Sequence, residues 1–313
     1  MSKTQGEIQL ASLLDQSDPV ALLAEVERCF RYSFPRKAFK PIAASFAQAS
    51  RLFAGLYPGY AACNTGYHDW AHTMAVFLAS ARLADGCALS GKSVGERGLR
   101  VLLAAALLHD SGYIQERGDR EGTGAKYTKV HVERSAAFTR VHAADFGLDG
   151  AEAESAARII LGTELGRDWA TIPFAGAEEI LAAQIVAAAD LLGQMADRIY
   201  LEKLLFLYWE FKEAGFGGYD CAFDILRKTL GFYASTRERL DGLLGAVSCR
   251  SREHFAARLG LDKDLYGEAI ARQMAYLEGI MADDSSNFRA KLKRVDLAAL
   301  ESSRAKEAPA PRR

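Results

Sequence analysis

The chain has 313 residues, of which half are hydrophobic and a quarter are charged, the balance of a folded protein with a substantial core. Its 39 Lys and Arg residues are matched by 40 Asp and Glu residues, which leaves a net charge of −1. This balance excludes a global basic field that would attract nucleic acid or an anionic membrane, so we expect neither as a partner.

Apolar residues recur at a spacing close to 3.6 along almost the whole chain, which is the period of an amphipathic α-helix. Boundary signals include Pro19 after Ser17-Asp18 at a helix start and the turn residues Tyr57-Pro58-Gly59. No stretch shows the alternation of a strand. Helices are predicted over 19–32, 40–56, 68–85, 96–109, 129–146, 150–162, 176–196, 198–214, 219–240, 252–259 and 264–281.

We therefore predict an all-α fold, a single compact helical bundle with no strong internal linker. Within it, 1–58 would pack on a core formed by 59–240, and 241–300 would add C-terminal helices. Residues 301–313 contain alanine as their only apolar residue type and are expected to be disordered.

The five cysteines are dispersed and form no CxxC pair, which is typical of reduced thiols in a cytoplasmic protein. The first residues, MSKTQGEIQLASLLDQ, lack the apolar core of a signal peptide. The longest apolar runs are too short to span a bilayer. We expect a cytoplasmic protein without a membrane partner.

Histidines and aspartates occur in a pattern that suggests a metal site. His68 and His72 share a helix face if the helix has begun by residue 68, His109-Asp110 ends an apolar run, and Asp190 interrupts another. Imidazole nitrogens and carboxylate oxygens together suit divalent ions such as Zn, Mn, Fe, Co or Ni, with positions left open for water.

Each of these residues also has an ordinary structural reading. A single histidine on an amphipathic helix is more often a packed or surface residue than a ligand, and Asp190 could cap a helix or pair with Arg198 or Lys203. His142 and His254 have no supporting neighbours and are expected at the surface. The aromatic run LFLYWEF (205–211) is interpreted as core packing.

Four segments in order resemble the HD superfamily of metal-dependent phosphohydrolases, and most closely its cyclic nucleotide phosphodiesterase-like branch. The segments are YHDWAHTMAV (67–76), LLAAALLHD (102–110), IILGTELGRD (159–168) and AAADLLGQMAD (187–197), the last opening a long helical region. Each is weak alone, but four in the right order form a specific pattern.

The resemblance implies an HD-domain helical fold and a set of roles. His72, His109, Asp110 and Asp190 would bind a first metal ion, and Asp110 would also bridge to a second. His68 would be the general acid that protonates the leaving oxygen. The cofactor would be one or two divalent ions, Mn, Mg, Zn, Fe, Co or Ni.

The sequence departs from the family pattern at several positions. Asp69 replaces an asparagine, Tyr113 lies near the place of a further histidine, and Thr163-Glu164 replaces a Thr-Asp pair. The segment KTLGFY (228–233) lacks the glutamine that grips purines in the phosphodiesterases, so the resemblance does not extend to purine cyclic nucleotides.

Six further residues are candidates for contacts near the metal or the substrate. Asp69 could hydrogen-bond an imidazole, His131 could join a second metal or contact phosphate, and Glu133 could hold a water. Gln194 lies one turn after Asp190, so it could line the pocket or pack between helices. The full set is Asp69, His131, Glu133, Thr163, Glu164 and Gln194.

The expected function is hydrolysis of a phosphoester bond in a nucleotide or other small phosphorylated metabolite, as a phosphodiesterase or phosphomonoesterase. A metal-activated hydroxide would attack phosphorus while His68 protonates the leaving group. The alternative is a regulatory module that binds nucleotide or metal without turnover. A homodimer is a possible assembly, because alanine-rich helical surfaces often pair.

Overall fold

The computed structural model describes residues 8–283 and 287–297, and the statements below concern these residues. Within these ranges the chain is helical and forms no strand, so the all-α prediction is confirmed. Its β-type pairing is limited to isolated bridges between Ala54 and Ala62 and between Tyr60 and Glu116. The tail expected to be disordered, 301–313, lies outside the described residues.

The helices follow one another with short connections. Their bounds are α1 Pro19–Ser33, α2 Lys40–Phe53, α3 Trp70–Leu89, α4 Glu96–Leu108, α5 His131–His142, α6 Gly150–Leu161, α7 Ala177–Met195, α8 Tyr200–Glu213, α9 Ala222–Asp241, α10 Ser251–Leu259, α11 Leu265–Ala282 and α12 Phe288–Lys291.

Helix starts agree with the residues that occupy them. Asp18 caps α1, where its carboxylate accepts hydrogen bonds from the backbone N–H groups of Val20 and Ala21. Pro19 takes the first helical position, where a missing N–H group costs nothing. Asp149 and Glu152 form a reciprocal capping box at the start of α6.

The centre of the molecule is α3, which is buried from His72 to Cys87. It packs against α1, α4, α7 and α10, so no side of it is left for solvent. Small residues allow the closest approach: a Cβ atom on Gly193 of α7 would lie 3.2 Å from the backbone nitrogen of Val76. The crossing of α3 and α7 brings His72 near Asp190.

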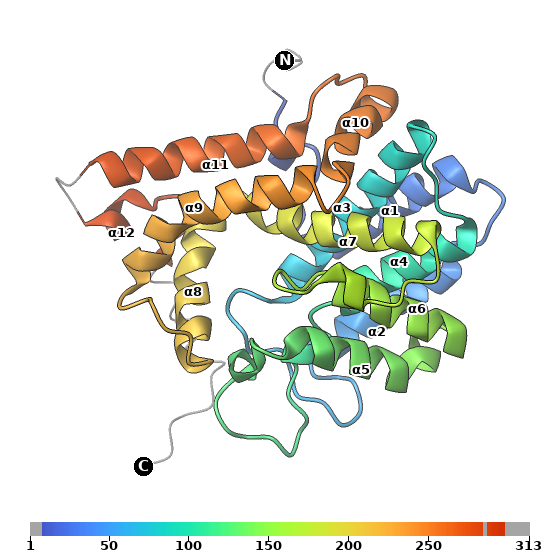
Figure 1. The fold of residues 1–313 in the computed structure, drawn as a ribbon, viewed down its shortest axis with the longest axis horizontal. Helices are drawn as coiled ribbons and strands as arrows, with labels where there is room; N and C mark the ends of the chain where they lie inside the picture. Colours follow the sequence, from blue (N-terminus) through green and yellow to red (C-terminus); the bar gives the residue numbers. More distant parts are fainter. Residues whose placement is uncertain (1–7, 284–286, 298–313) are drawn as a thin grey trace.

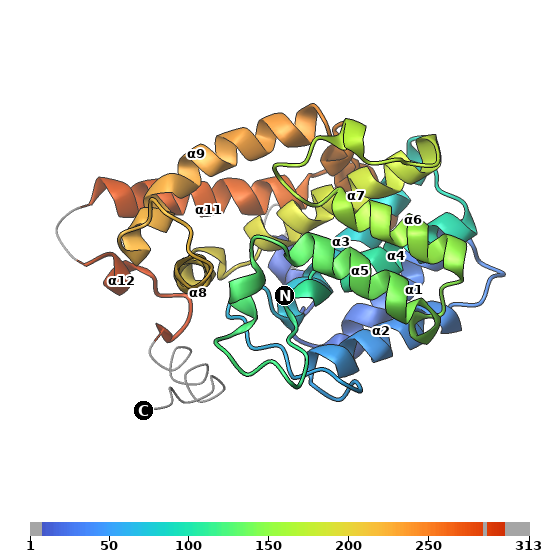
Figure 2. The same cartoon turned by 60° about the horizontal axis from the view of Figure 1, so that its bottom comes forward.

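The helices form two groups that share α7. In both views α2, α4, α5 and α6 lie at one end of the molecule and α8, α9, α11 and α12 at the other (Figures 1 and 2). Helix α11 of the second group contacts α7, and α8 contacts the short 3-10 helix Gly124–Tyr127. Residues of α7, α8 and α9 line a pocket in this part of the molecule.

Two details of the predicted helix over 68–85 are wrong. The helix begins at Trp70, because Asp69 is its N-cap, so His68 precedes it. The helix also continues through Gly86 to Leu89. Gly86 serves close packing instead of termination: a Cβ atom there would fall 1.8 Å from the carbonyl oxygen of Arg250.

None of the helices in the described ranges has both the length and the apolar composition needed to cross a bilayer alone. The helices α7 and α8 reach that composition only when they are taken together, and they meet at a bend of 107°.

Candidate metal centre and its pocket

His72 is positioned by the start of α3. The Asp69 carboxylate accepts a hydrogen bond of 2.9 Å from the backbone N–H of His72 and so fixes the first turn. Asp69 was a candidate for a hydrogen bond to an imidazole, whereas this hydrogen bond goes to the backbone. The His72 side chain is buried and directed toward α7 and the end of α4.

His109 and Asp110 reach the same place because α4 ends at Leu108. His109 is the C-cap of α4, and Asp110 is the N-cap of a short 3-10 helix, Ser111–Tyr113. The two consecutive side chains therefore project from the end of a helix instead of from its side. The His109 Nδ1–H donates to the carbonyl oxygen of Ala106 at 2.8 Å, which directs the lone pair of Nε2 toward Asp110.

Asp190 lies in the middle of α7 and is held by a chain of hydrogen bonds. The Gln194 amide donates to Asp190 Oδ1 at 2.8 Å, and the Tyr67 hydroxyl donates to Gln194 Oε1 at 2.9 Å. Lys203, considered above as an ion-pair partner of Asp190, instead pairs with Asp197. Gln194 therefore orients a candidate ligand.

The four side chains converge on one point. His72 Nε2 lies 3.2 Å from His109 Nε2, 3.3 Å from Asp110 Oδ2 and 3.2 Å from Asp190 Oδ1. His109 Nε2 lies 3.2 Å from Asp110 Oδ2 and 3.6 Å from Asp190 Oδ1. Two donors that each bind one ion at about 2.1 Å stand about 3.0–3.4 Å apart, so the spacing suits a shared cation.

One oxygen of the four-residue cluster lacks a hydrogen bond that a metal ion would replace. Asp110 Oδ2 is buried and accepts no hydrogen bond of good geometry, although the Nε2 atoms of His72 and His109 lie 3.3 and 3.2 Å away, and such buried oxygens are rare in folded proteins. The Nε2 atom of His109 faces the same point. A divalent cation would satisfy both, so the residues present fit the ion that the sequence predicted.

Electrostatics in the cluster are those of a ligand set. Burial by itself raises the pKa of Asp110, but His109 and His72 reverse this and hold that pKa well below its ordinary value. The pKa of Asp190 is lowered in the same way. Burial favours neutral His109, yet Asp110 and Asp190 keep its pKa well above the ordinary value. Both carboxylates are thus ionised and ready to bind a cation.

His68 lies beside this cluster with its own acidic partner. Its Nδ1–H donates to Glu210 Oε2 at 2.6 Å, and its ring lies 6.0 Å from the ring of His72 at 85°. Burial lowers the pKa of His68, but the Glu210 carboxylate outweighs burial and raises it above the ordinary value. His68 therefore reaches the site from the segment before α3 instead of from a shared helix face.

Glu210 was missed by the sequence analysis, which interpreted LFLYWEF as core packing. Its side chain is buried, with Oε1 accepting from the backbone N–H of Tyr67 and Oε2 accepting from His68. The available signal was the single carboxylate within an aromatic, apolar run, since a buried charge must have a partner.

His131 and Tyr113 complete the polar floor. The Tyr113 ring is stacked against the rings of both His68 and His131, with centroid distances of 4.4 Å, and the two imidazole centroids lie 5.9 Å from each other. The His131 Nδ1–H donates to the carbonyl oxygen of Thr128 at 2.7 Å, so the lone pair of Nε2 faces Asp110 Oδ1 at 3.7 Å. Asp110 thus offers one oxygen to the four-residue cluster and the other to His131.

The remaining candidates lie around this floor or away from it. Thr163 and Glu164 line the pocket, where the Thr163 hydroxyl donates to the carbonyl oxygen of Ile160 and Glu164 pairs with Arg167. Glu133 has an exposed carboxylate that pairs with Arg167. The expected water-holding role of Glu133 therefore has no support in its contacts.

A cavity of about 630 Å³ opens above the cluster. Its floor includes His68, His131 and Asp190, and its walls come from α7, α8, α9 and the segment that joins the last two. This volume lies within the range of small-molecule sites, roughly 300–1,000 Å³. Asp190 is the member of the cluster that lines this cavity, next to His68 and His131.

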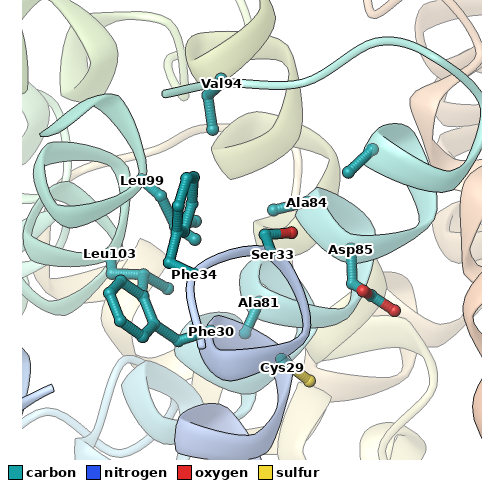
Figure 3. A pocket seen from close by; sticks show the side chains of 11 residues that line it. Cys29, Phe30, Ser33, Phe34, Ala81, Ala84, Asp85, Val94, Leu99 and Leu103 are labelled. Atoms are coloured by element: carbon teal, nitrogen blue, oxygen red, sulfur yellow. The ribbon is translucent and has the colours of Figure 1, made fainter. Parts of the chain in front are cut away.

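A second hollow lies between α1, α3 and α4, and it differs in kind. Phe30, Phe34, Leu99 and Leu103 surround it (Figure 3). Its volume of about 10 Å³ is enough for about one water molecule. It is a packing defect in the core.

His142 and His254 are not surface residues as expected. His142 lies between the hydroxyl groups of Tyr57 and Tyr60, at 3.0 and 3.1 Å. His254 is buried and donates from Nδ1 to Asp85 at 2.7 Å. His254 also lies near Glu25 and Cys29, but burial raises the pKa of the Cys29 thiol and keeps it protonated, a poor metal ligand.

One comparison with known proteins gives a match. A family model described as Npun_R2479-like matches residues 56–239, more than half of the chain and all four convergent side chains. The chain therefore belongs to the Npun_R2479-like family. No curated protein and no solved structure matches it.

Proposed function

We propose that this member of the Npun_R2479-like family is a divalent-metal-dependent phosphohydrolase of the HD type. The observation that carries the proposal is the convergence of His72, His109, Asp110 and Asp190, with donor atoms 3.2–3.6 Å from His72 or His109, beside an open cavity that Asp190 lines. Histidine and carboxylate ligands with open positions are typical of hydrolytic metal sites.

A divalent cation held by these residues supplies Lewis acidity toward water and toward the phosphoryl oxygens. His131 supports a second ion, since its Nε2 faces the oxygen of Asp110 that the four-residue cluster leaves available. Two hydrogen bonds from outside the four-residue cluster hold its side chains in place before a metal binds. The Gln194 amide donates to Asp190, and the Ala106 carbonyl accepts from His109.

His68 is the proposed general acid. Glu210 holds its Nδ1–H and favours the imidazolium, while the rest of the ring lines the cavity. As the bond between phosphorus and the leaving oxygen breaks, the imidazolium gives its Nε2 proton to that oxygen and releases an alcohol. A water oxygen forms the new bond to phosphorus, and the proton that water loses restores the imidazolium for the next cycle.

The test is a hydrolysis screen over phosphomonoesters, phosphodiesters and nucleotides, with Mn, Mg, Zn, Co and Ni supplied in turn to chelator-treated protein. We expect turnover with at least one ion and its loss in Asp110→Ala, with Asp119→Ala as the control. Asp119 lies in the loop after the site, where it binds Lys126 and Tyr127.

If no ion supports turnover of any ester, the phosphohydrolase proposal fails. Tight binding of nucleotide or metal in that case would support the alternative, a regulatory module without turnover.

A further inference from the structure

We propose that the alcohol part of the substrate is apolar, an alkyl or aryl group rather than a nucleoside. This inference rests on the proposed function for the phosphoester chemistry, but its main support is the lining of the cavity. The reacting phosphate must lie on the floor beside His68 and Asp190, so the rest of the substrate must lie against the walls.

The walls are apolar and come from three consecutive parts of the chain. Helix α8, the segment 214–221 and helix α9 all present aliphatic or aromatic side chains to the cavity. The main contributors are Leu204, Leu207, Phe211, Phe216, Ile225 and Phe232. Burying a hydrocarbon group against such walls is favourable in proportion to the apolar area removed from water.

The threonine hydroxyls around the cavity are already committed to the backbone. Thr128 donates to the carbonyl oxygen of Ala125 at 2.6 Å, Thr163 to that of Ile160 at 2.8 Å and Thr229 to that of Ile225 at 2.8 Å. These hydroxyls therefore have no proton left to donate to a ligand.

The two lysines of the walls each use one of their three N–H donors on the segment 214–221. The Lys129 ammonium donates to the carbonyl oxygen of Gly215 at 3.0 Å and lies 5.1 Å from the centroid of the Phe216 ring. Lys228 donates to the carbonyl oxygen of Gly218 and lies 4.3 Å from the Tyr219 ring centroid. Both lysines thus hold the aromatic segment 214–221 in place as a wall.

A nucleobase would bind poorly in this environment. It carries several donors and acceptors around its ring, and each one that loses water without gaining a partner lowers affinity. Specific recognition of a base needs side chains with free donors and acceptors, as at sites built to hydrogen-bond a substrate group. An alkyl or aryl body has no such requirement.

The first experiment compares n-alkyl phosphates from ethyl to octyl, and phenyl and naphthyl phosphates, with nucleoside monophosphates, all below their critical micelle concentrations. We expect kcat/KM to rise about threefold to fourfold per added methylene group until the cavity is filled. Nucleotides should lie below octyl phosphate by at least tenfold.

The matched variants are Phe232→Ala and Phe223→Ala. Both phenylalanines are partly buried on α9, but Phe232 lines the cavity whereas Phe223 packs against Phe288. Phe232→Ala should reduce the gain per methylene group, mainly through KM, and Phe223→Ala should keep the slope of the parent protein.

Binding separates this inference from the proposed function. Chelator-treated protein is titrated with n-alkylphosphonates against a fluorescent apolar probe, anilinonaphthalene sulfonate. Displacement that strengthens with chain length supports an apolar ligand even if no ester is hydrolysed, an outcome that would reject only the phosphohydrolase proposal. Equal affinity along the series, or nucleotides turned over as efficiently as octyl phosphate, would overturn the inference.

Discussion

The Nδ1 atom of His68 lies 2.6 Å from Oε2 of Glu210, a residue 142 positions further along the chain. The same carboxylate accepts the backbone N–H of Tyr67 through Oε1. One side chain of α8 therefore fixes both the backbone and the imidazole of the segment that precedes α3. Its position makes Glu210 the positioning residue for the proposed general acid.

Glu210→Gln should lower kcat by an amount that depends on how much protonation the leaving group needs. The amide keeps an acceptor for Tyr67 but no longer favours the His68 imidazolium, so protonation of the leaving oxygen becomes slow. We expect kcat for an alkyl phosphate to fall about 10- to 100-fold. For p-nitrophenyl phosphate, whose leaving group needs little protonation, kcat should change by less than about threefold.

The control for this change is Glu213→Gln, one turn further along α8. Glu213 contacts Thr123 in the loop and makes no hydrogen bond to a site residue. An equal loss with both esters in Glu210→Gln, or metal release from it, would show that Glu210 supports the fold of the site instead of the proton transfer.

Metal binding should stabilise the folded protein, because an ion that binds only the folded state raises the free energy of unfolding. At an ion concentration about 100 times Kd the gain is about 2.7 kcal/mol. Asp190→Asn removes a charged ligand and should abolish most of this gain, while Asp119→Asn keeps it. Thermal unfolding measured with and without added Mn or Zn gives the increment for each protein.

The metal-free variant should be less stable than the metal-free parent protein at neutral pH. His109 and His72 hold the pKa of Asp190 below its ordinary value, so the ionised carboxylate favours the folded state, and Asp190→Asn removes this contribution. A parent protein whose unfolding temperature is unchanged by every ion tested would contradict the metal site itself.

Much of the helical architecture could be predicted from periodicity, because most helices bury one face against a neighbour and end at recognisable caps. The boundary at His68 could not, since Asp69 acts as a cap only if the chain before it is held elsewhere, here by Glu210. The predicted helix ended before Gly86, because the carbonyl of Arg250, which requires a glycine there, lies far away in sequence.

The candidate site could be predicted in part, for a related reason. His109-Asp110 at the end of an apolar run and Asp190 within another are visible as polar residues in buried surroundings. Glu210 is equally visible in LFLYWEF, but its role depends on how α8 folds back onto residue 67. The placement of Glu133 in solvent depends on Arg167, which no spacing rule connects to it.

The ion pair of Asp85 with Arg258, far from the candidate site, should contribute to the free energy of unfolding in a way that depends on acid pH. Asp85 accepts hydrogen bonds from His254 and from two nitrogens of Arg258. Asp85→Asn leaves Arg258 without its charge partner and should lower the free energy of unfolding by about 3 kcal/mol at neutral pH, the usual cost of breaking such a pair. Turnover per folded molecule should not change.

The pH dependence follows from the direction of the Asp85 shift. Burial raises the pKa of Asp85, but His254 and Arg258 outweigh it and hold that pKa below the ordinary value of 3.8. The unfolded chain therefore takes up the proton first as pH falls, so the contribution is complete above about pH 5 and declines below 3.8. Denaturant unfolding of parent and variant should converge in that acid range.

The matched control is Asp262→Asn, because Asp262 makes the same two-pronged contact with Arg252 but at the surface. Little change is expected there, since exposed ion pairs contribute little. If both variants lost the same stability, burial of the Asp85 pair would not be the cause.

Gly112 sets the distance between Asp110 and His131. A Cβ atom at this position would fall 2.0 Å from the carbonyl oxygen of His131 and 2.8 Å from the backbone nitrogen of Ser135, so α5 must move away in Gly112→Ala. We expect a loss of about 1–3 kcal/mol in the free energy of unfolding from this overpacking. Because His131 moves with α5, turnover should fall even at temperatures where the variant is fully folded.

Gly279→Ala distinguishes this steric effect from the general effect of adding a methyl group to a glycine. Gly279 lies on the exposed face of α11 with nothing within 4 Å of its virtual Cβ, so alanine should stabilise the helix by about 0.5–1 kcal/mol. Urea unfolding and kcat measured on both variants decide the matter. If Gly112→Ala kept full turnover while losing stability, His131 would have no part in the reaction, and one ion held by the four-residue cluster would be sufficient.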